Sequence, residues 1–279
     1  MTAYVLTLSC PDQPGIVAAI STLLANRQLN IVESQQYGDA ESGRFFMRIG
    51  FEGAIELAAC QELFAATAAK FDMSLNLRPA QQKPRVLILL SKFDHCLIDL
   101  IYRRQVGSLP IEIAAIASNH TVGRQWADNA AIDYHLLGGK DAKADNEARL
   151  DALIAEQNID LVVLARYMQI LTADFVARYA GRIINIHHSF LPSFKGAEPY
   201  SQAHRRGVKI IGATAHFVTA DLDEGPIIAQ GVEPVRHDMD VAAFIDVGRD
   251  TERRTLARAV KLFAEERVFL NGTTTVVFD

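Results

Sequence analysis

Apolar and polar positions in the first part of the chain switch between two periods, one typical of strands and one typical of helices. Strand-like runs cover Tyr4–Ser9, Asn30–Gly38, Arg44–Glu52 and Ser74–Leu77. Helical spacing of apolar residues covers Ile16–Leu24 and Glu56–Phe71. The two middle strand-like runs are separated by the turn sequence DAESG, which predicts a hairpin. The resulting order, βαββαβ, predicts a ferredoxin-like module.

A polar segment with two prolines, Arg78–Pro84, follows this module. Proline fits neither the interior of a helix nor a central strand, so the segment is predicted to be a linker. We therefore expect two domains, one over residues 1–83 and one over residues 84–279. A chain of 279 residues is long enough for two domains of ordinary size.

Strand-like and helical runs alternate in the second part of the chain, as they do in α/β proteins. The expected strands are Arg85–Leu90, Ile111–Ala117, Leu161–Ala165, Arg182–His187, Ile210–Val218 and Pro226–Val232. The expected helices are Cys96–Arg104, Ala144–Gln157, Ala173–Tyr179 and a long last helix at about Val241–Phe269. Continuous apolar strands are typical of parallel sheets that are covered on both faces. The pattern predicts a Rossmann-like, doubly wound domain, which binds ligands at the carboxyl ends of its strands.

Composition narrows the class of protein. Hydrophobic residues make up 49% and charged residues 22% of the chain, a balance typical of globular proteins. The net charge of -5 and the lack of a basic block argue against nucleic acid as a partner. The longest apolar runs have the length of a strand, far below the ~20 residues that cross a bilayer, and the N-terminus does not resemble a signal peptide. Three widely spaced cysteines fit a reducing cytoplasm, where we expect the protein, away from membranes.

Polar side chains collect on two strands and in one loop of the second domain. Asn185 and His187 point to the same face of a predicted strand, because side chains in a strand repeat every second residue, and His188 points the opposite way. His216 lies on a later strand, and Asp223 lies in the loop that follows it. Because His187 and His188 diverge and the chain has no HExxH spacing, we expect no metal. His188 is interpreted as a structural residue or as one that supports the site from behind.

The N-terminal module resembles an ACT domain. The resemblance is carried by DQPGIV at Asp12–Val17 and by LNIVE at Leu29–Glu33. It implies an amino-acid effector, methionine or glycine, and a homo-oligomer formed by pairing at the domain edges. The alternative is a plain ferredoxin-like module whose only role is assembly.

The second domain resembles the formyl-transfer domain of enzymes that use 10-formyltetrahydrofolate. The resemblance is carried by NIHHSFLPSFKGAEPY at Asn185–Tyr200 and by GATAHFVTADLDEGPIIAQ at Gly212–Gln230. It implies a catalytic trio and a histidine that supports it, which fall on Asn185, His187, Asp223 and, as the support, His216. The residue types suit this chemistry, because an amide N–H and an imidazole N–H can stabilise the oxyanion of a tetrahedral intermediate. An aspartate can move protons in the same site if partial burial raises its pKa towards working pH.

A third segment, LARYMQILT at Leu164–Thr172, resembles the part of the same family that lines the pterin pocket. The resemblance implies folate contacts from Met168, Ile170 and Leu171. The alternative is an ordinary βα loop that leads into a helix.

The acceptor of the formyl group separates the members of this family. A ribose-phosphate acceptor needs a glycine-rich turn after the first strand, and Ser91–Leu100 contains no glycine. A tRNA acceptor needs a basic surface, and this chain is acidic. Lys92, Asp94 and His95 occupy the predicted acceptor position, where they block an acceptor or help to place water; the sequence leaves both open.

Over essentially the whole chain, these features resemble formyltetrahydrofolate deformylases. The resemblance implies hydrolysis of 10-formyltetrahydrofolate to formate and tetrahydrofolate, with the folate as substrate and no cofactor. It also implies formate supply for purine synthesis and balance of one-carbon pools. Two alternatives remain: a transferase that acts on a small amine, and a non-catalytic amino-acid sensor. The retained Asn185, His187 and Asp223 argue against the sensor.

Overall fold

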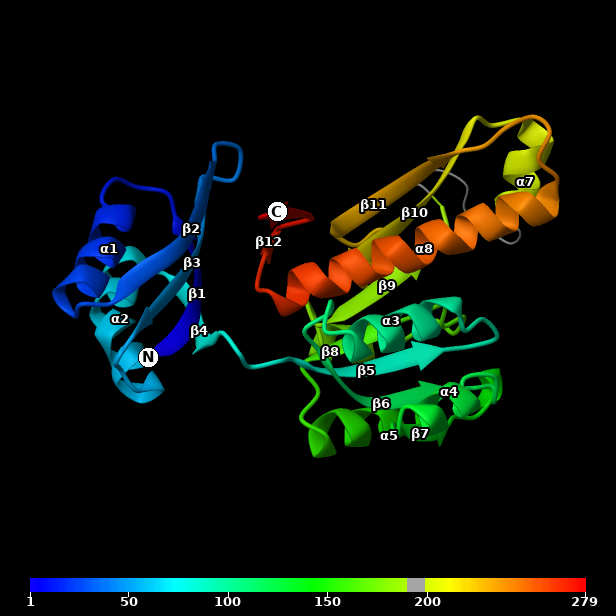
Figure 1. The fold of residues 1–279 in the computed structure, drawn as a ribbon, viewed down its shortest axis with the longest axis horizontal. Helices are drawn as coiled ribbons and strands as arrows, with labels where there is room; N and C mark the ends of the chain where they lie inside the picture. Colours follow the sequence, from blue (N-terminus) through cyan, green and yellow to red (C-terminus); the bar gives the residue numbers. More distant parts are fainter. Residues whose placement is uncertain (190–198) are drawn as a thin grey trace. The chain divides into compact units, whose positions relative to one another are not determined.

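The computed structural model describes residues 1–189 and 199–279, which form two compact units (Figure 1). The first unit contains Met1–Gln82 together with Glu266–Asn271 and Val276–Asp279. The second contains Lys83–Glu265 and Gly272–Thr275. The division near residue 83 lies where the proline-rich segment predicts it. The expectation that the second domain runs to the end of the chain is wrong, because most of the C-terminal residues belong to the first unit.

The first unit has the predicted order βαββαβ. Its elements are β1 (Thr2–Pro11), α1 (Ile16–Asn26), β2 (Asn30–Asp39), β3 (Arg44–Gly53), α2 (Leu57–Phe71) and β4 (Ser74–Pro79). The strands form an antiparallel sheet in the order β2-β3-β1-β4, and both helices pack on one face of it (Figure 1). Arg78 and Pro79, predicted to be linker, belong to β4. Proline is tolerated there because β4 is an edge strand.

Residues from the end of the chain pack with the first unit through aromatic and ionic contacts. The ring of Phe269, in β12 (Val268–Asn271), lies 5.7 Å from the fully buried ring of Phe46. The Arg267 guanidinium lies 2.8 Å from the carboxylate of Glu33. The last long helix, α8, ends at Ala264, earlier than predicted. It ends there because Glu266 takes a left-handed backbone with φ 57°, which turns the chain out of the helix.

The second unit is built on a mixed sheet with the order β11-β10-β9-β8-β5-β6-β7, which confirms the α/β class and the doubly wound arrangement. The strands are β5 (Arg85–Leu90), β6 (Glu112–Ser118), β7 (Asp133–Leu136), β8 (Leu161–Leu164), β9 (Ile183–His187), β10 (Ile210–Phe217) and β11 (Ile227–Pro234). The helices are α3 (His95–Gln105), α4 (Arg124–Asn129), α5 (Lys143–Glu156), α6 (Ala173–Arg178), α7 (Pro199–Arg206) and α8 (Val241–Ala264), with a short 3-10 turn at Lys140–Ala142. A final strand, β13 (Thr274–Val277), pairs with β12.

The strand order places a ligand site where the chain reverses its direction of winding. From the central strand β5 the chain moves outward to β6 and β7, and then returns to β8 on the other side of β5. The loops after β5 and β8 therefore leave the sheet in different directions, and folds of this kind bind ligands at the carboxyl ends of the strands near such a point. The strand β10 runs antiparallel to β9, and β11 runs antiparallel to β10, so the two extend the sheet beyond β9. In the described part of the chain, every helix is too short or too polar to cross a membrane.

Candidate active site

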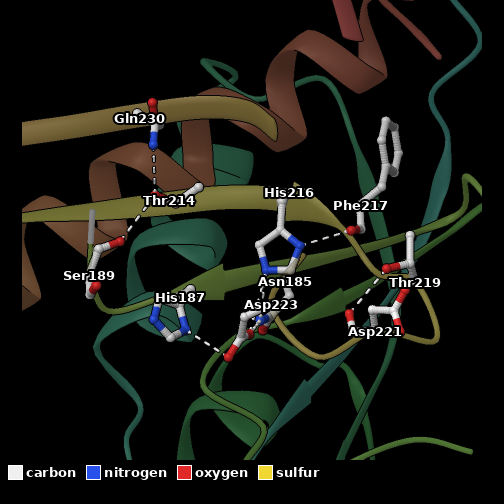
Figure 2. Close-up of polar contacts among 10 residues, drawn as sticks. All are labelled: Asn185, His187, Ser189, Thr214, His216, Phe217, Thr219, Asp221, Asp223 and Gln230. Atoms are coloured by element: carbon white, nitrogen blue, oxygen red, sulfur yellow. Dashed lines mark hydrogen bonds and ion pairs between the residues drawn. The ribbon is translucent and has the colours of Figure 1, made fainter. Parts of the chain in front are cut away.

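The pairing register of two antiparallel strands places the polar side chains of the site next to one another. His216 of β10 lies opposite Asn185 of β9, and Thr214 lies opposite His187. Residues opposite each other in an antiparallel pair point to the same face of the sheet, so these side chains share one face. His187 and His216 are both buried, with 6% and 2% of their surface exposed. Strand geometry alone therefore brings together two imidazoles and an amide from distant parts of the sequence (Figure 2).

The loop after β10 returns a carboxylate to this face. Asp223 has a left-handed backbone with φ 58°, an uncommon conformation for a residue other than glycine. Its carboxylate lies 3.2 Å from His187 Nδ1 and 3.4 Å from Asn185 Nδ2, and it lies 3.7 Å from His216 Nε2 (Figure 2). The structure thus brings together the four residues that the sequence singled out. Their roles in catalysis remain predictions.

The charge state of Asp223 differs from the one expected from the sequence. Burial raises the pKa of this carboxyl, but the neighbouring rings of His187 and His216 outweigh burial and hold the pKa well below its usual range. The expectation that partial burial lifts the pKa of Asp223 towards neutrality is wrong for this arrangement. Asp223 is therefore a carboxylate across the neutral pH range.

Two ring nitrogens define how the imidazoles are oriented. His216 Nδ1–H donates to the carbonyl oxygen of Phe217 at 2.8 Å, which turns Nε2 towards Asn185 Nδ2 at 3.3 Å (Figure 2). His187 uses Nδ1 for Asp223, and its Nε2 is buried without a hydrogen-bond partner among the described residues. A buried ring nitrogen without a partner is rare, and it marks the point where a substrate atom or a water can bind.

His188 lines the same pocket as His187, and its ring lies near those of His187 and Tyr200. Its ring centroid lies 5.0 Å from that of His187 and 6.3 Å from that of Tyr200. Burial, together with the charges of Arg166 and His187, lowers the pKa of His188 to about 4. The His188 ring is therefore neutral at neutral pH.

A pocket of about 310 Å³ opens onto this face. Asn185, His187, His216 and Asp223 line it together with the predicted folate contacts Met168, Ile170 and Leu171. Met168 and Ile170 are 54% and 62% exposed, unusual values for such large apolar side chains, and they offer apolar surface to a flat ring. The pocket therefore combines an apolar side with a polar end.

Buried polar residues fix the loop that carries these apolar contacts. The backbone N–H and the hydroxyl of Thr172 donate to the Glu147 carboxylate at 2.7 and 2.6 Å. The backbone N–H of Met168 donates to Ser91 Oγ at 3.0 Å, and the N–H of Ser91 donates to the carbonyl oxygen of Arg166 at 3.2 Å. The sequence analysis missed Glu147, because a glutamate in a charged helix gives no sign that it is buried.

Two of the three residues predicted for the acceptor position have other partners in the structure. Asp94 accepts a hydrogen bond from Trp126 Nε1 at 2.8 Å, and His95 Nε2 lies 2.8 Å from the Glu252 carboxylate. Lys92 is exposed. None of the three is among the described residues that line the pocket. Their proposed effect on an acceptor or on water remains a prediction.

One group of described residues has the geometry of a metal site. The ligand atoms of His95, Cys96 and Glu252 lie within 4.8 Å of one another. Burial raises the pKa of the Cys96 thiol well above its usual value, so the thiol keeps its proton. Arg166 adds a positive charge 3.5 Å from Glu252. A cation is disfavoured beside a guanidinium, so we interpret this group as a hydrogen-bonded ionic cluster.

Part of the sequence resemblance lies beyond what the structure describes. The Leu191–Pro192 segment falls within residues 190–198, outside the described residues. The site geometry above depends on Asn185, His187, His216 and Asp223 alone.

Comparisons with known proteins match both units. The formyl transferase family matches residues 84–260, and the ACT domain family matches residues 4–59. A formyltetrahydrofolate deformylase of Bacillus subtilis is 49% identical over 279 residues, covering 98% of this chain and 93% of that protein. The crystal structure of formyltetrahydrofolate deformylase from Burkholderia mallei matches with a TM-score of 0.97 and 47% identity, and all of both chains is covered. Glycinamide ribonucleotide transformylase 1 from Symbiobacterium toebii matches with a TM-score of 0.68 and 32% identity, covering 73% of this chain and 98% of that one.

The fold and the family matches together define an enzyme of the formyl-transfer class. Similarity to the deformylases extends over both units, whereas the transformylase match leaves about a quarter of this chain uncovered. The chain belongs to the formyltetrahydrofolate deformylase family.

The loop that carries Asp223 depends on a close backbone approach at Gly225. An alanine Cβ at this position would lie 1.7 Å from the carbonyl oxygen of Phe217. We expect Gly225→Ala to lower the free energy of unfolding by about 3 kcal/mol or more and to displace Asp223. Gly139→Ala is the matched control, since an added Cβ there meets nothing within 4 Å. Urea denaturation of both variants checks the prediction, and equal losses for the two would contradict it.

The lowered pKa of Asp223 predicts a pH-dependent contribution to stability. A depressed folded-state pKa stabilises the protein above the unfolded value, about pH 4, and this stabilisation is lost as the pH falls below that value. We expect the free energy of unfolding of the wild type to exceed that of Asp223→Asn by on the order of 1–3 kcal/mol at pH 7. This difference should shrink below about pH 4. The control is Asp221→Asn, an exposed carboxylate in the same loop. Unfolding free energies measured from pH 3 to pH 7 test this; a difference that stays constant with pH rules it out.

Proposed function

We propose that the protein hydrolyses 10-formyltetrahydrofolate to formate and tetrahydrofolate. The observation that carries the proposal is the convergence of Asn185, His187 and Asp223 at the polar end of a pocket whose other side is apolar. Membership of the deformylase family supports the same substrate. The pterin would pack against Met168, Ile170 and Leu171, and its formyl group would lie at the polar end.

The reaction needs a donor for the oxygen of the formyl group. When water attacks the formyl carbon, that oxygen becomes an oxyanion, and donors placed in advance stabilise it by about 2.7–4 kcal/mol each. Asn185 Nδ2–H is suited to this role, and His187 Nε2 joins it when the ring carries a proton on both nitrogens, because Nδ1–H already donates to Asp223. The contacts of Asn185 Nδ2, at 3.3 and 3.4 Å, are long hydrogen bonds, so the amide can exchange them for the substrate at little cost.

Asp223 orients His187 and transfers a proton from the attacking water to the leaving nitrogen. Its carboxylate holds His187 through Nδ1, which leaves Nε2 facing the reacting group. As Asn185 turns to the formyl oxygen, Asp223 loses one donor, and its affinity for a proton rises. The carboxylate can then take a proton from the attacking water and pass it to N10, whose bond to the formyl carbon breaks. His216 supports this proton transfer, because its Nε2 lies 3.7 Å from the Asp223 carboxylate.

Water as the acceptor fits the residues after β5. Asp94 and His95 are held by Trp126 and Glu252, so this segment is filled by side chains that bind one another. The segment also has no glycine turn to hold a phosphate. Both features favour hydrolysis over transfer to a phosphorylated amine.

The direct test is formate release from 10-formyltetrahydrofolate without any added amine. We expect the wild type to release formate at an unchanged rate whether or not small amines are present. Strict dependence on an amine would instead support a transferase.

Substitution of the site residues should remove turnover but leave folate binding intact. We expect Asp223→Asn and Asn185→Ala each to lower kcat by about 10²–10³, because each removes a group that acts on the transition state. Folate affinity should stay near the wild-type value, since the apolar contacts are unchanged. Asp246→Asn, which changes an exposed carboxylate that is not among the described residues lining the pocket, is the matched control. Near-normal rates of formate release in Asp223→Asn would falsify the assignment.

Further proposals concern the role of the reaction in the cell. We place the protein in the cytoplasm, where the formate it releases would supply purine synthesis and the hydrolysis would balance one-carbon pools. No nucleic acid, membrane, metal or cofactor takes part in this scheme. The acidic net charge of -5 agrees with a small-molecule substrate.

The ACT unit supports a regulatory proposal. We expect methionine or glycine to bind this unit and change the rate of formate release, in a homo-oligomer formed through the unit. Initial rates with each amino acid, with alanine as the control, test the effector, and light scattering on the same samples tests the assembly. A rate that responds to neither methionine nor glycine contradicts the regulatory role.

A further inference from the structure

A guanidinium that the scheme above does not use lines the same pocket. Arg166 follows β8 and is the only arginine or lysine among the described residues that line the pocket, whereas Asp221 and Asp223 both line it. Two carboxylates repel an anion, so any anionic ligand here depends on Arg166 for a balancing charge.

The Arg166 side chain is buried, and two of its three nitrogens lack an acceptor in the part of the chain that the structure describes. Only 10% of it is exposed, and Nε and Nη1 have no hydrogen-bond partner among the described residues. Buried guanidinium donors without acceptors are unfavourable, so these groups call for an acceptor that the described residues do not supply. Among those residues, Glu252 is the carboxylate paired with Arg166, and its Oε2 lies 3.5 Å from Arg166 Nε, too far for a good hydrogen bond.

Glu252 is fully engaged by other donors. The Tyr200 hydroxyl donates to Oε1 at 2.5 Å, and His95 Nε2 donates to Oε2 at 2.8 Å. Burial raises the pKa of Glu252, but His95, Arg166 and Tyr200 outweigh burial and lower it, so the carboxylate is charged. Glu252 therefore balances the charge of Arg166 and fixes its position while leaving its donors unsatisfied.

The backbone and one aromatic ring also hold Arg166 in place. Its φ of 66° lies in the left-handed region, which a long side chain seldom occupies without a functional reason. The guanidinium carbon lies 5.4 Å from the centroid of the Phe93 ring, and Arg249 lies over the same ring at 5.6 Å. Arg249 is not among the described residues lining the pocket.

We propose that Arg166 receives the formate released by hydrolysis, with Glu252, His95 and Tyr200 as positioning residues. The inference rests on the proposed function, because formate is its product. In the reaction the water oxygen bonds to the formyl carbon, the C–N10 bond breaks, and N10 takes one proton. The second proton of the water is lost to solvent as formic acid ionises. A guanidinium binds a carboxylate through two parallel N–H donors, so Arg166 binds the product more strongly than the neutral formyl group.

The test compares formate binding in matched variants. Inhibition by sodium formate is measured at constant ionic strength for the wild type, Arg166→Gln, Arg166→Lys and Arg249→Gln. We expect the formate inhibition constant to rise about tenfold or more in Arg166→Gln, because a charge-assisted pair is lost. Arg166→Lys keeps the positive charge but not the two parallel N–H donors of the guanidinium. Its formate inhibition constant should lie between those of Arg166→Gln and the wild type. Arg249→Gln should stay near the wild type, since it removes the stacking partner outside the pocket.

A second measurement does not require turnover. Line broadening of ¹³C-formate by the protein reports binding directly, and Arg166→Lys keeps the test open if Arg166→Gln does not fold. Equal formate binding by the wild type and by the folded Arg166 variants overturns the proposal, as does a wild type that does not bind formate. A wild type that binds formate through Arg166 but releases none from 10-formyltetrahydrofolate would instead contradict the proposed function alone.

Discussion

The pairing of one carboxylate with donors from two neighbouring strands is the constraint on which the site depends. Asp223 contacts His187 and Asn185 of β9 and His216 of β10, and the β9–β10 register decides that these groups share a face. A shift of the register by one residue would send them to the opposite face. Gly225 lets the loop return closely enough for the carboxylate to arrive. Sheet geometry, loop sterics and electrostatics therefore converge on one charged group.

Two buried carboxylates, those of Asp223 and Glu252, are both kept charged by neighbouring hydrogen-bond donors. Asp223 and Glu252 would be costly to bury as ions, yet neighbouring donors hold the pKa of each carboxyl below its usual range. Asp223 faces the reacting end of the pocket. Glu252 holds Arg166, and it ties α8 to His95 in α3 and to Tyr200 in α7. In the proposed scheme, catalysis depends on Asp223 and product binding on Arg166, and both residues line one pocket.

The fold class and the membership of the trio could be predicted because each depends on local periodicity and on short patterns. Apolar runs gave most strands, and period-two spacing placed Asn185 and His187 on one face. The strand β7 (Asp133–Leu136) was missed because it lies at the sheet edge and lacks a continuous apolar run. The end of α8 was misplaced because the left-handed turn at Glu266 leaves no trace in side-chain periodicity. Arg166 and the lowered pKa of Asp223 were out of reach, because both depend on which groups meet in space.

The origin of the oxygen in the released formate tests the central claim most directly. The enzyme would be given 10-formyltetrahydrofolate in water enriched in ¹⁸O, and the formate analysed by mass spectrometry. If Asn185, His187 and Asp223 direct water onto the formyl carbon, each formate carries one ¹⁸O atom from solvent, and Asp223→Asn forms little of it. Unlabelled formate, or a formyl group found on an amine instead, would contradict the account.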